Sequence, residues 1–149
     1  YNLLQTESPR IHVVEMGPST LGNPFLALFI SSPDNLARVE ELRQINAQLS
    51  DPRGIPEERI RSLVDEGKVV INQSMSLHAT EIGGSLMAVE LAYDLASRND
   101  EEALRILDNV IFVMIPSLNP DGQIIVTDWY RETVGTEFEG ASYPSLYHI

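Results

Sequence analysis

Short apolar runs of strand length alternate with amphipathic stretches along most of the chain. Residues rich in β-branched and aromatic side chains form four such runs, at 11–16, 25–30, 69–73 and 109–115. The runs at 25–30 and 109–115 are apolar almost throughout, which is typical of strands buried on both faces. Turn residues between positions 17 and 24 predict that the first two runs form a hairpin.

Helical periodicity marks the segments between these runs. Apolar residues recur at helical spacing over residues 34–49, and Ser32 is expected to cap that helix. Shorter helices are expected at 56–66 and 100–107, where acidic residues lie in the first turn. Residues 84–97 are apolar over a wide surface, which predicts a helix buried against a sheet.

The same spacing predicts which helical side chains are buried. On the helix at 84–97, two lines of residues should face the sheet: Leu86, Val89 and Tyr93, and Met87, Leu91 and Leu95. On the helix at 56–66, the buried residues should be Ile60, Leu63 and Val64. Residues 116–122 are expected to form a loop, and residues 124–126 are compatible with either a strand or a helical turn. Because strands and helices alternate, the predicted fold class is α/β, with a mixed, largely parallel sheet flanked by helices.

Composition and charge narrow the possible functions. The chain has 149 residues, of which 43% are hydrophobic, enough to form a core in one domain or part of one. Its net charge is −12, so the basic surface that nucleic-acid binding needs is not expected. No apolar run approaches the roughly 20 residues of a membrane span. The chain contains no Cys, so a metal would be held by His and carboxylate side chains.

The pattern His-x-x-Glu occurs twice. His12 and Glu15 lie in a predicted strand, where residues three apart point to opposite faces and cannot share a ligand. His78 and Glu81 follow the strand at 69–73, and in a turn residues at this spacing can converge. Imidazole nitrogen and carboxylate oxygen are good zinc donors, and open α/β sheets bind ligands where strands end. The alternative is an ordinary loop His followed by a Glu that caps a helix.

A second motif, Asn119-Pro120-Asp121-Gly122, directly follows the strand at 109–115. Pro fixes one φ angle, Gly accepts a positive one, and Asn and Asp side chains can bind backbone amides. The motif therefore predicts a tight structural turn at the end of that strand.

Together these motifs resemble the carboxypeptidase A-like zinc carboxypeptidase family. The resemblance rests on a strand followed by Ser-Leu-His-Ala-Thr-Glu (76–81), a buried helix, and a strand followed by Pro-Ser-Leu-Asn-Pro-Asp-Gly (116–122). It extends over about residues 9–149, so residues 1–149 are expected to be the N-terminal part of a single catalytic domain with three layers. The chain lacks an initiator Met, which also favours a segment of a longer protein.

The resemblance implies a zinc-dependent carboxypeptidase that hydrolyses the C-terminal peptide bond of peptides with a free C-terminus. His78 and Glu81 would be zinc ligands, and Arg131, near Trp129, would polarise the scissile carbonyl. The alternative is that Arg131 is an ordinary surface arginine among acidic residues. An extracellular or periplasmic location is also implied.

Other residues of the family's site would follow later in the chain. These are a second His ligand, an Asn-Arg pair that binds the substrate carboxylate, and a Glu general base. Residues 1–149 alone are therefore expected to be inactive. His148 could be proposed as the third ligand, but the corresponding His of the family comes much further along the chain. Two alternative functions stay open: a non-catalytic α/β module, and a related zinc amidase or deacylase.

Overall fold

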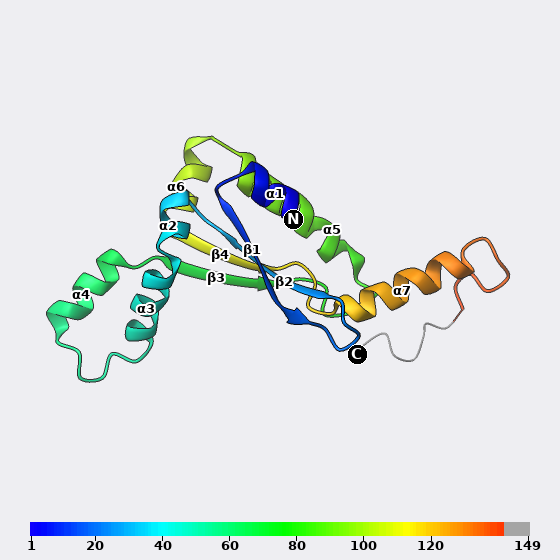
Figure 1. Cartoon of the computed structure of the whole chain (residues 1–149), viewed down its shortest axis with the longest axis horizontal. Coiled ribbons are helices and arrows are strands. Elements are labelled where there is room, and N and C mark those ends of the chain that lie inside the picture. The colour runs from blue at the N-terminus through cyan, green and yellow to red at the C-terminus, as the bar shows by residue number, and fades with distance from the viewer. Residues whose placement is uncertain (142–149) are drawn as a thin grey trace.

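A four-stranded mixed sheet forms the centre of residues 1–141, the part of the chain that the computed structural model describes (Figure 1). The strands are β1 (Ile11–Pro18), β2 (Pro24–Ile30), β3 (Val69–Ser74) and β4 (Val110–Ile115). They lie in the order β1-β2-β4-β3. The predicted strands and the hairpin are confirmed, and β4 lies inside the sheet. Among the described strands the parallel pairing is confined to β3 and β4, because β1–β2 and β2–β4 are antiparallel.

The described helices are α1 (Asn2–Glu7), α2 (Pro33–Ala37), α3 (Val39–Ser50), α4 (Glu57–Glu66), α5 (Ile82–Ser97), α6 (Glu101–Asn109) and α7 (Pro120–Thr133). Ser32 caps α2 as predicted, since its side chain accepts a hydrogen bond from the backbone N–H of Asn35 at 3.4 Å. The single helix predicted for 34–49 is wrong, because the backbone at Arg38 (φ −116°, ψ 22°) separates α2 from α3.

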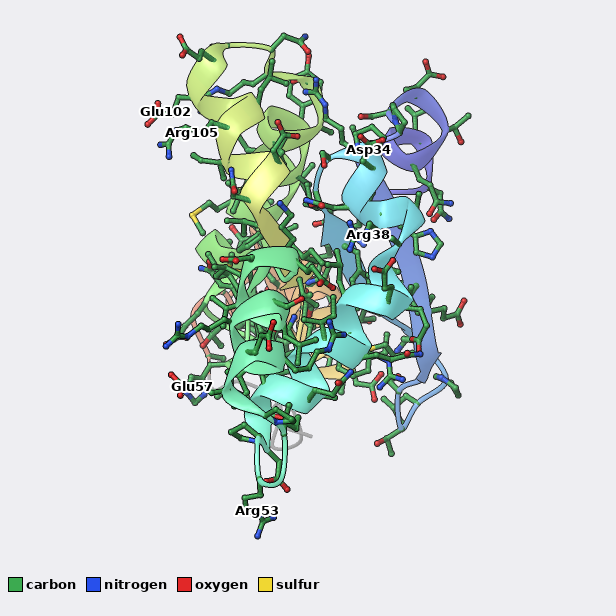
Figure 2. All side chains as sticks on the ribbon, turned by 90° about the vertical axis from the view of Figure 1, so that its left-hand side faces the viewer. Asp34, Arg38, Arg53, Glu57, Glu102 and Arg105 are labelled. Atoms are coloured by element: carbon green, nitrogen blue, oxygen red, sulfur yellow. The ribbon has the colours of Figure 1, made fainter. Side chains whose placement is uncertain are left out.

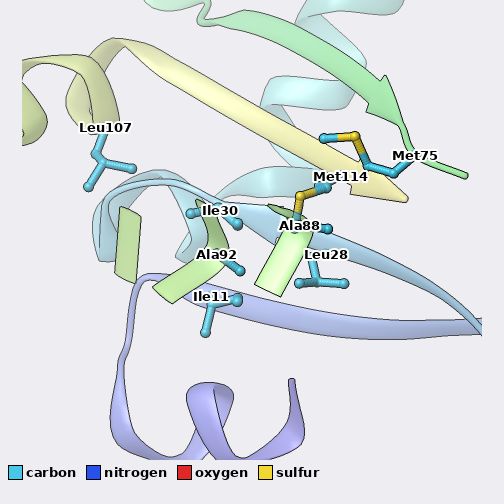
Figure 3. Packing of buried hydrophobic residues seen from close by; sticks show 8 residues of the cluster. All are labelled: Ile11, Leu28, Ile30, Met75, Ala88, Ala92, Leu107 and Met114. Carbon is cyan, nitrogen blue, oxygen red and sulfur yellow. The ribbon is translucent and has the colours of Figure 1, made fainter. Parts of the chain in front are cut away.

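Two apolar clusters, one on each face of the sheet, give the predicted three layers. On one face, α1, α5 and α6 pack against the sheet around Leu28, Ile30 and Met114 (Figure 3). On the other face, α3 and α4 pack through Leu42, Ile45 and Leu63 against Ile111 of β4. The two central strands, β2 and β4, are therefore covered on both sides.

Helix α5 contacts the sheet through small residues, contrary to the sequence prediction. Its buried residues are Ala88, Ala92 and Ala96, which follow one another at a spacing of four. Large apolar residues that were expected to be buried are exposed instead: Leu86 (66%), Met87 (47%), Val89 (53%) and Tyr93 (58%). Leu91 and Leu95 pack at the border of the cluster, as predicted. Alanines let the helix lie close to the strands, so the larger side chains project away from them.

Charged side chains lie on the outer surfaces of the helices. Figure 2 shows this for Asp34, Glu57, Glu102 and Arg105; it also labels Arg38 and Arg53, which lie in the connections before and after α3. Several of the arginines pair with a nearby carboxylate, as Arg38 does with Glu41 at 2.7 Å. Exposed pairs of this kind add little to stability, so the fold depends on its apolar clusters. No helix within residues 1–141 is both long and apolar enough to cross a membrane.

Two neighbouring residues on α4 differ completely in burial. Leu63 is fully buried, whereas Val64, which was expected to be buried, is 61% exposed. Consecutive helical residues are separated by about 100° around the axis, so only one of the two can face the sheet.

Replacing Leu63 by Ala should therefore lower the free energy of unfolding by about 2–5 kcal/mol, since it leaves a cavity in a buried cluster. Replacing Val64 by Ala should change it by less than about 0.5 kcal/mol. Urea unfolding of both variants measures the difference, and equal losses would contradict the arrangement of α4.

Candidate metal centre

The loops that follow β3 and β4 begin side by side at one edge of the sheet. Parallel strands end at the same edge, and backbone hydrogen bonds continue the pairing past their ends. The N–H of Met75 donates to the carbonyl of Ile115 at 2.9 Å, and the N–H of Leu118 donates to the carbonyl of Met75 at 2.8 Å. Two motifs about 40 residues apart in sequence are thereby brought next to each other.

His78 and Glu81 lie at the two ends of one hydrogen-bonded turn. The backbone N–H of Glu81 donates to the carbonyl of His78 at 3.0 Å, and α5 begins at the next residue. Both residues are exposed. Although Glu81 occupies the N-cap position, its side chain makes no capping hydrogen bond. The alternative in which Glu81 serves as a helix cap is therefore wrong, and convergence of the two side chains on a metal stays a prediction.

The turn is reached through a strained residue. Ser76 has a φ of 51°, in the left-handed region that residues other than Gly rarely occupy. Its hydroxyl donates to the backbone carbonyl of Glu81 at 3.5 Å, which spans the turn. Backbone strain of this kind persists where the surrounding structure imposes it, and such residues cluster at functional sites.

The donor types at this turn fit zinc in part. Imidazole and carboxylate groups are zinc ligands, but a catalytic zinc usually has three protein ligands and one water. Within residues 1–141, no group of three or more His, Cys, Asp or Glu side chains is placed to hold a metal ion. His148 lies outside the described residues. The described chain therefore offers two donors, and a complete site needs at least one more.

The Asn119–Gly122 motif begins helix α7 instead of forming an isolated turn. The side-chain oxygen of Asn119 accepts the N–H of Gly122 at 2.9 Å, and Pro120 occupies the first helical position. The prediction of a loop over 116–122 is thus wrong for its last three residues. Residues 124–126, which the sequence left open, are helical. The amide nitrogen of Asn119 also donates to the carbonyl of Leu77 at 3.4 Å, next to His78.

Sequence reasoning missed the role of Asp121. Its buried carboxylate accepts hydrogen bonds from the hairpin between β1 and β2: from the Ser19 hydroxyl, from Asn23 Nδ2 at 2.7 Å and from the N–H of Leu21 at 3.0 Å. The Ser19 hydroxyl, followed by Asn23 and Leu21, holds the pKa of Asp121 below its usual value, although burial opposes this. The partners lie about 100 residues away, so no local pattern signals them.

The structure also shows where His12, Glu15 and Arg131 lie. His12 and Glu15 lie in β1, whose alternating side chains put them on opposite faces, as predicted. Arg131 lies near the end of α7, roughly 16 Å along the helix axis from Pro120. Its side chain is 74% exposed and pairs with Asp128 at 3.6 Å, as the surface alternative expected. Its catalytic role stays a prediction.

The comparison with models of protein families shows to which family the chain belongs. Residues 1–140 match the family model described as zinc carboxypeptidase. The chain belongs to the zinc carboxypeptidase family. The family and fold predicted from the two motifs are therefore confirmed. No curated protein sequence matches the chain.

Solved structures of carboxypeptidases share the fold of this family member. A metallo-carboxypeptidase from Burkholderia cenocepacia aligns with a TM-score of 0.53 at 22% identity, over 83% of this chain and 26% of its own. Carboxypeptidase A from Helicoverpa armigera aligns with a TM-score of 0.51 at 22% identity, over 85% of this chain and 24% of its own. The chain thus spans about a quarter of the length of these structures.

Replacing Asp121 by Asn should destabilise the protein most at neutral pH, because an amide nitrogen would face a donor of the hairpin. The folded-state pKa of Asp121 is below its ordinary value of 3.8. The stabilisation from its carboxylate is therefore complete above that value and is lost as the pH falls through the folded-state pKa. The difference in unfolding free energy between wild type and variant should shrink on acidification.

Urea unfolding at several pH values measures this difference. The same exchange at the exposed Asp65 controls for the loss of one negative charge. A difference for Asp121 that does not change with pH would contradict the assigned hydrogen bonds.

Proposed function

We propose that the intact protein is a zinc-dependent carboxypeptidase acting on peptides with a free C-terminus. One observation carries the proposal: a chain of the zinc carboxypeptidase family presents exposed His78 and Glu81 in a hydrogen-bonded turn where β3 ends. The absence of a capping bond at Glu81 supports it, because no helix cap competes for that carboxylate. A zinc ligand must be reachable by the metal, and the exposed side chains of His78 and Glu81 satisfy this.

In this proposal His78 and Glu81 hold zinc through an imidazole nitrogen and a carboxylate oxygen. Zinc bound there would polarise the scissile carbonyl and activate a water. The chain's own contribution is to keep the two donors three residues apart in one turn, so little order must be gained when the metal binds. A third ligand, a Glu general base and an Asn-Arg pair that grips the substrate carboxylate are expected elsewhere in the intact protein.

Arg131 completes the proposed machinery as the group that stabilises the negative charge developing on the carbonyl oxygen. A guanidinium stays charged at any working pH and offers several N–H donors in a fixed plane. Its pair with Asp128 is exposed and long, at 3.6 Å, so substrate could displace it at small cost. An extracellular or periplasmic location follows from the family as part of the same proposal.

Replacing His78 by Ala, or Glu81 by Gln, should strongly reduce the zinc content of the intact protein and abolish hydrolysis of a peptide with a free C-terminus. Each change removes one of the proposed ligands. Replacing His12, an exposed histidine on β1, by Ala should leave both unchanged. Metal analysis and a peptidase assay test this. Unaltered zinc content in His78→Ala would show that the zinc assignment is wrong.

Replacing Arg131 by Ala should lower kcat by about 10²–10³, the usual effect of losing one oxyanion-stabilising donor, with a smaller effect on KM. Asp128→Asn is the matched control, because it breaks the pair seen in the structure and keeps the guanidinium. Steady-state kinetics separate the two roles. If Arg131 merely pairs with Asp128, both variants will behave alike and kcat will hardly change.

A further inference from the structure

We propose that Asn119 is a positioning residue for the metal loop, defined as residues 75–81, and that it holds His78 in place by binding the loop's backbone. The inference rests on the proposed zinc site at His78 and Glu81. It assigns to the Asn-Pro-Asp-Gly motif a role beyond starting α7.

The amide of Asn119 serves two elements at once. Its oxygen accepts the N–H of Gly122 and caps α7, while its nitrogen donates to the carbonyl of Leu77, the residue before His78. Asn119 is 8% exposed, so water competes little for these groups. The two halves of one planar amide are thus divided between a helix and the metal loop.

The helix start that carries Asn119 is itself fixed. Two residues further on, the carboxylate of Asp121 is bound by Ser19, Leu21 and Asn23 at the tip of the hairpin. Ser19 and Asp121, together with Asn119 and Leu77, line a depression of about 240 Å³ next to the metal loop. Asn119 therefore connects the metal loop to a helix start that is itself hydrogen-bonded to the hairpin.

The hydrogen bond from Asn119 acts on the exposed part of the metal loop. Met75, Ser76 and Ala79 of the loop are buried, whereas strand β3 and the residues Leu77 and His78 are exposed. Ser76 is strained, and backbone bonds at Met75 hold only the beginning of the loop. The bond from Asn119 acts directly beside the imidazole, where a small displacement changes the geometry offered to a metal.

The competing explanation is that Asn119 is a helix cap and nothing more. The two roles use different atoms, so a substitution can separate them. Serine ranks with Asn as an N-cap and can accept the N–H of Gly122, but its hydroxyl is too short to replace the amide nitrogen at Leu77. Asn119→Ser therefore keeps the hydrogen bond that caps α7 and removes the hydrogen bond to the carbonyl of Leu77.

The experiment measures the zinc Kd of the intact protein by competition with a chromophoric chelator. Asp100→Ser is the matched control, because Asp100 caps α6 through the N–H of Ala103, at 3.1 Å, and is not bonded to residues 75–81. His78→Ala is the reference for loss of a ligand. Each variant is measured at a temperature at which near-UV circular dichroism shows that it is folded.

We expect Asn119→Ser to weaken zinc binding by about 10-fold to 100-fold, the usual effect of losing a residue that orients a ligand. Asp100→Ser should bind zinc as the wild type does. If His78→Ala loses zinc but Asn119→Ser keeps wild-type affinity, the positioning role is overturned while the proposed function stands. If His78→Ala itself keeps wild-type affinity, the proposed zinc site falls, and this inference falls with it.

Discussion

The parallel pairing of β3 with β4 is the constraint on which the candidate site depends. It is the one parallel pair among the described strands, and it makes two chain segments leave the sheet at the same edge. The backbone bonds of Met75 to Ile115 and Leu118 extend that pairing into the loops. Antiparallel strands would have sent the two motifs to opposite edges of the sheet, and the amide of Asn119 could not have reached the loop of His78.

The layers around the sheet explain why this pairing is stable. Strand β4 is covered on one face by α5 and α6 and on the other by α3 and α4, so its residues lie between two apolar clusters. Strand β3 is different: all its residues are exposed, and within the described residues β4 is its only partner. The loop that carries His78 therefore starts from the least buried strand of the sheet, which makes its backbone ties to β4 and Asn119 more important.

Much of this architecture follows from local sequence, because burial on two faces requires uninterrupted apolar runs. The runs at 25–30 and 109–115 predict β2 and β4 almost to the residue, and Ser32 is correctly expected to cap a helix. Which face of α5 is buried could not be predicted from the sequence. Large apolar side chains and alanines both satisfy helical spacing, and only the distance to the sheet decides that Ala88, Ala92 and Ala96 lie inside.

The candidate site also has one part that could be predicted from local sequence and one part that could not. His78 and Glu81 are recognisable because both donors belong to one short turn that follows a predicted strand, so their spacing and their placement can both be read from local sequence. Asp121 is not, because its partners are in a hairpin that approaches it only after the sheet has formed. The proposed zinc site would thus combine a local part, ordered by a few backbone hydrogen bonds, with long-range hydrogen bonds. Because a catalytic zinc usually has three protein ligands, the remaining ligands of the proposed site would have to come from segments that the fold of the intact protein brings close to this turn.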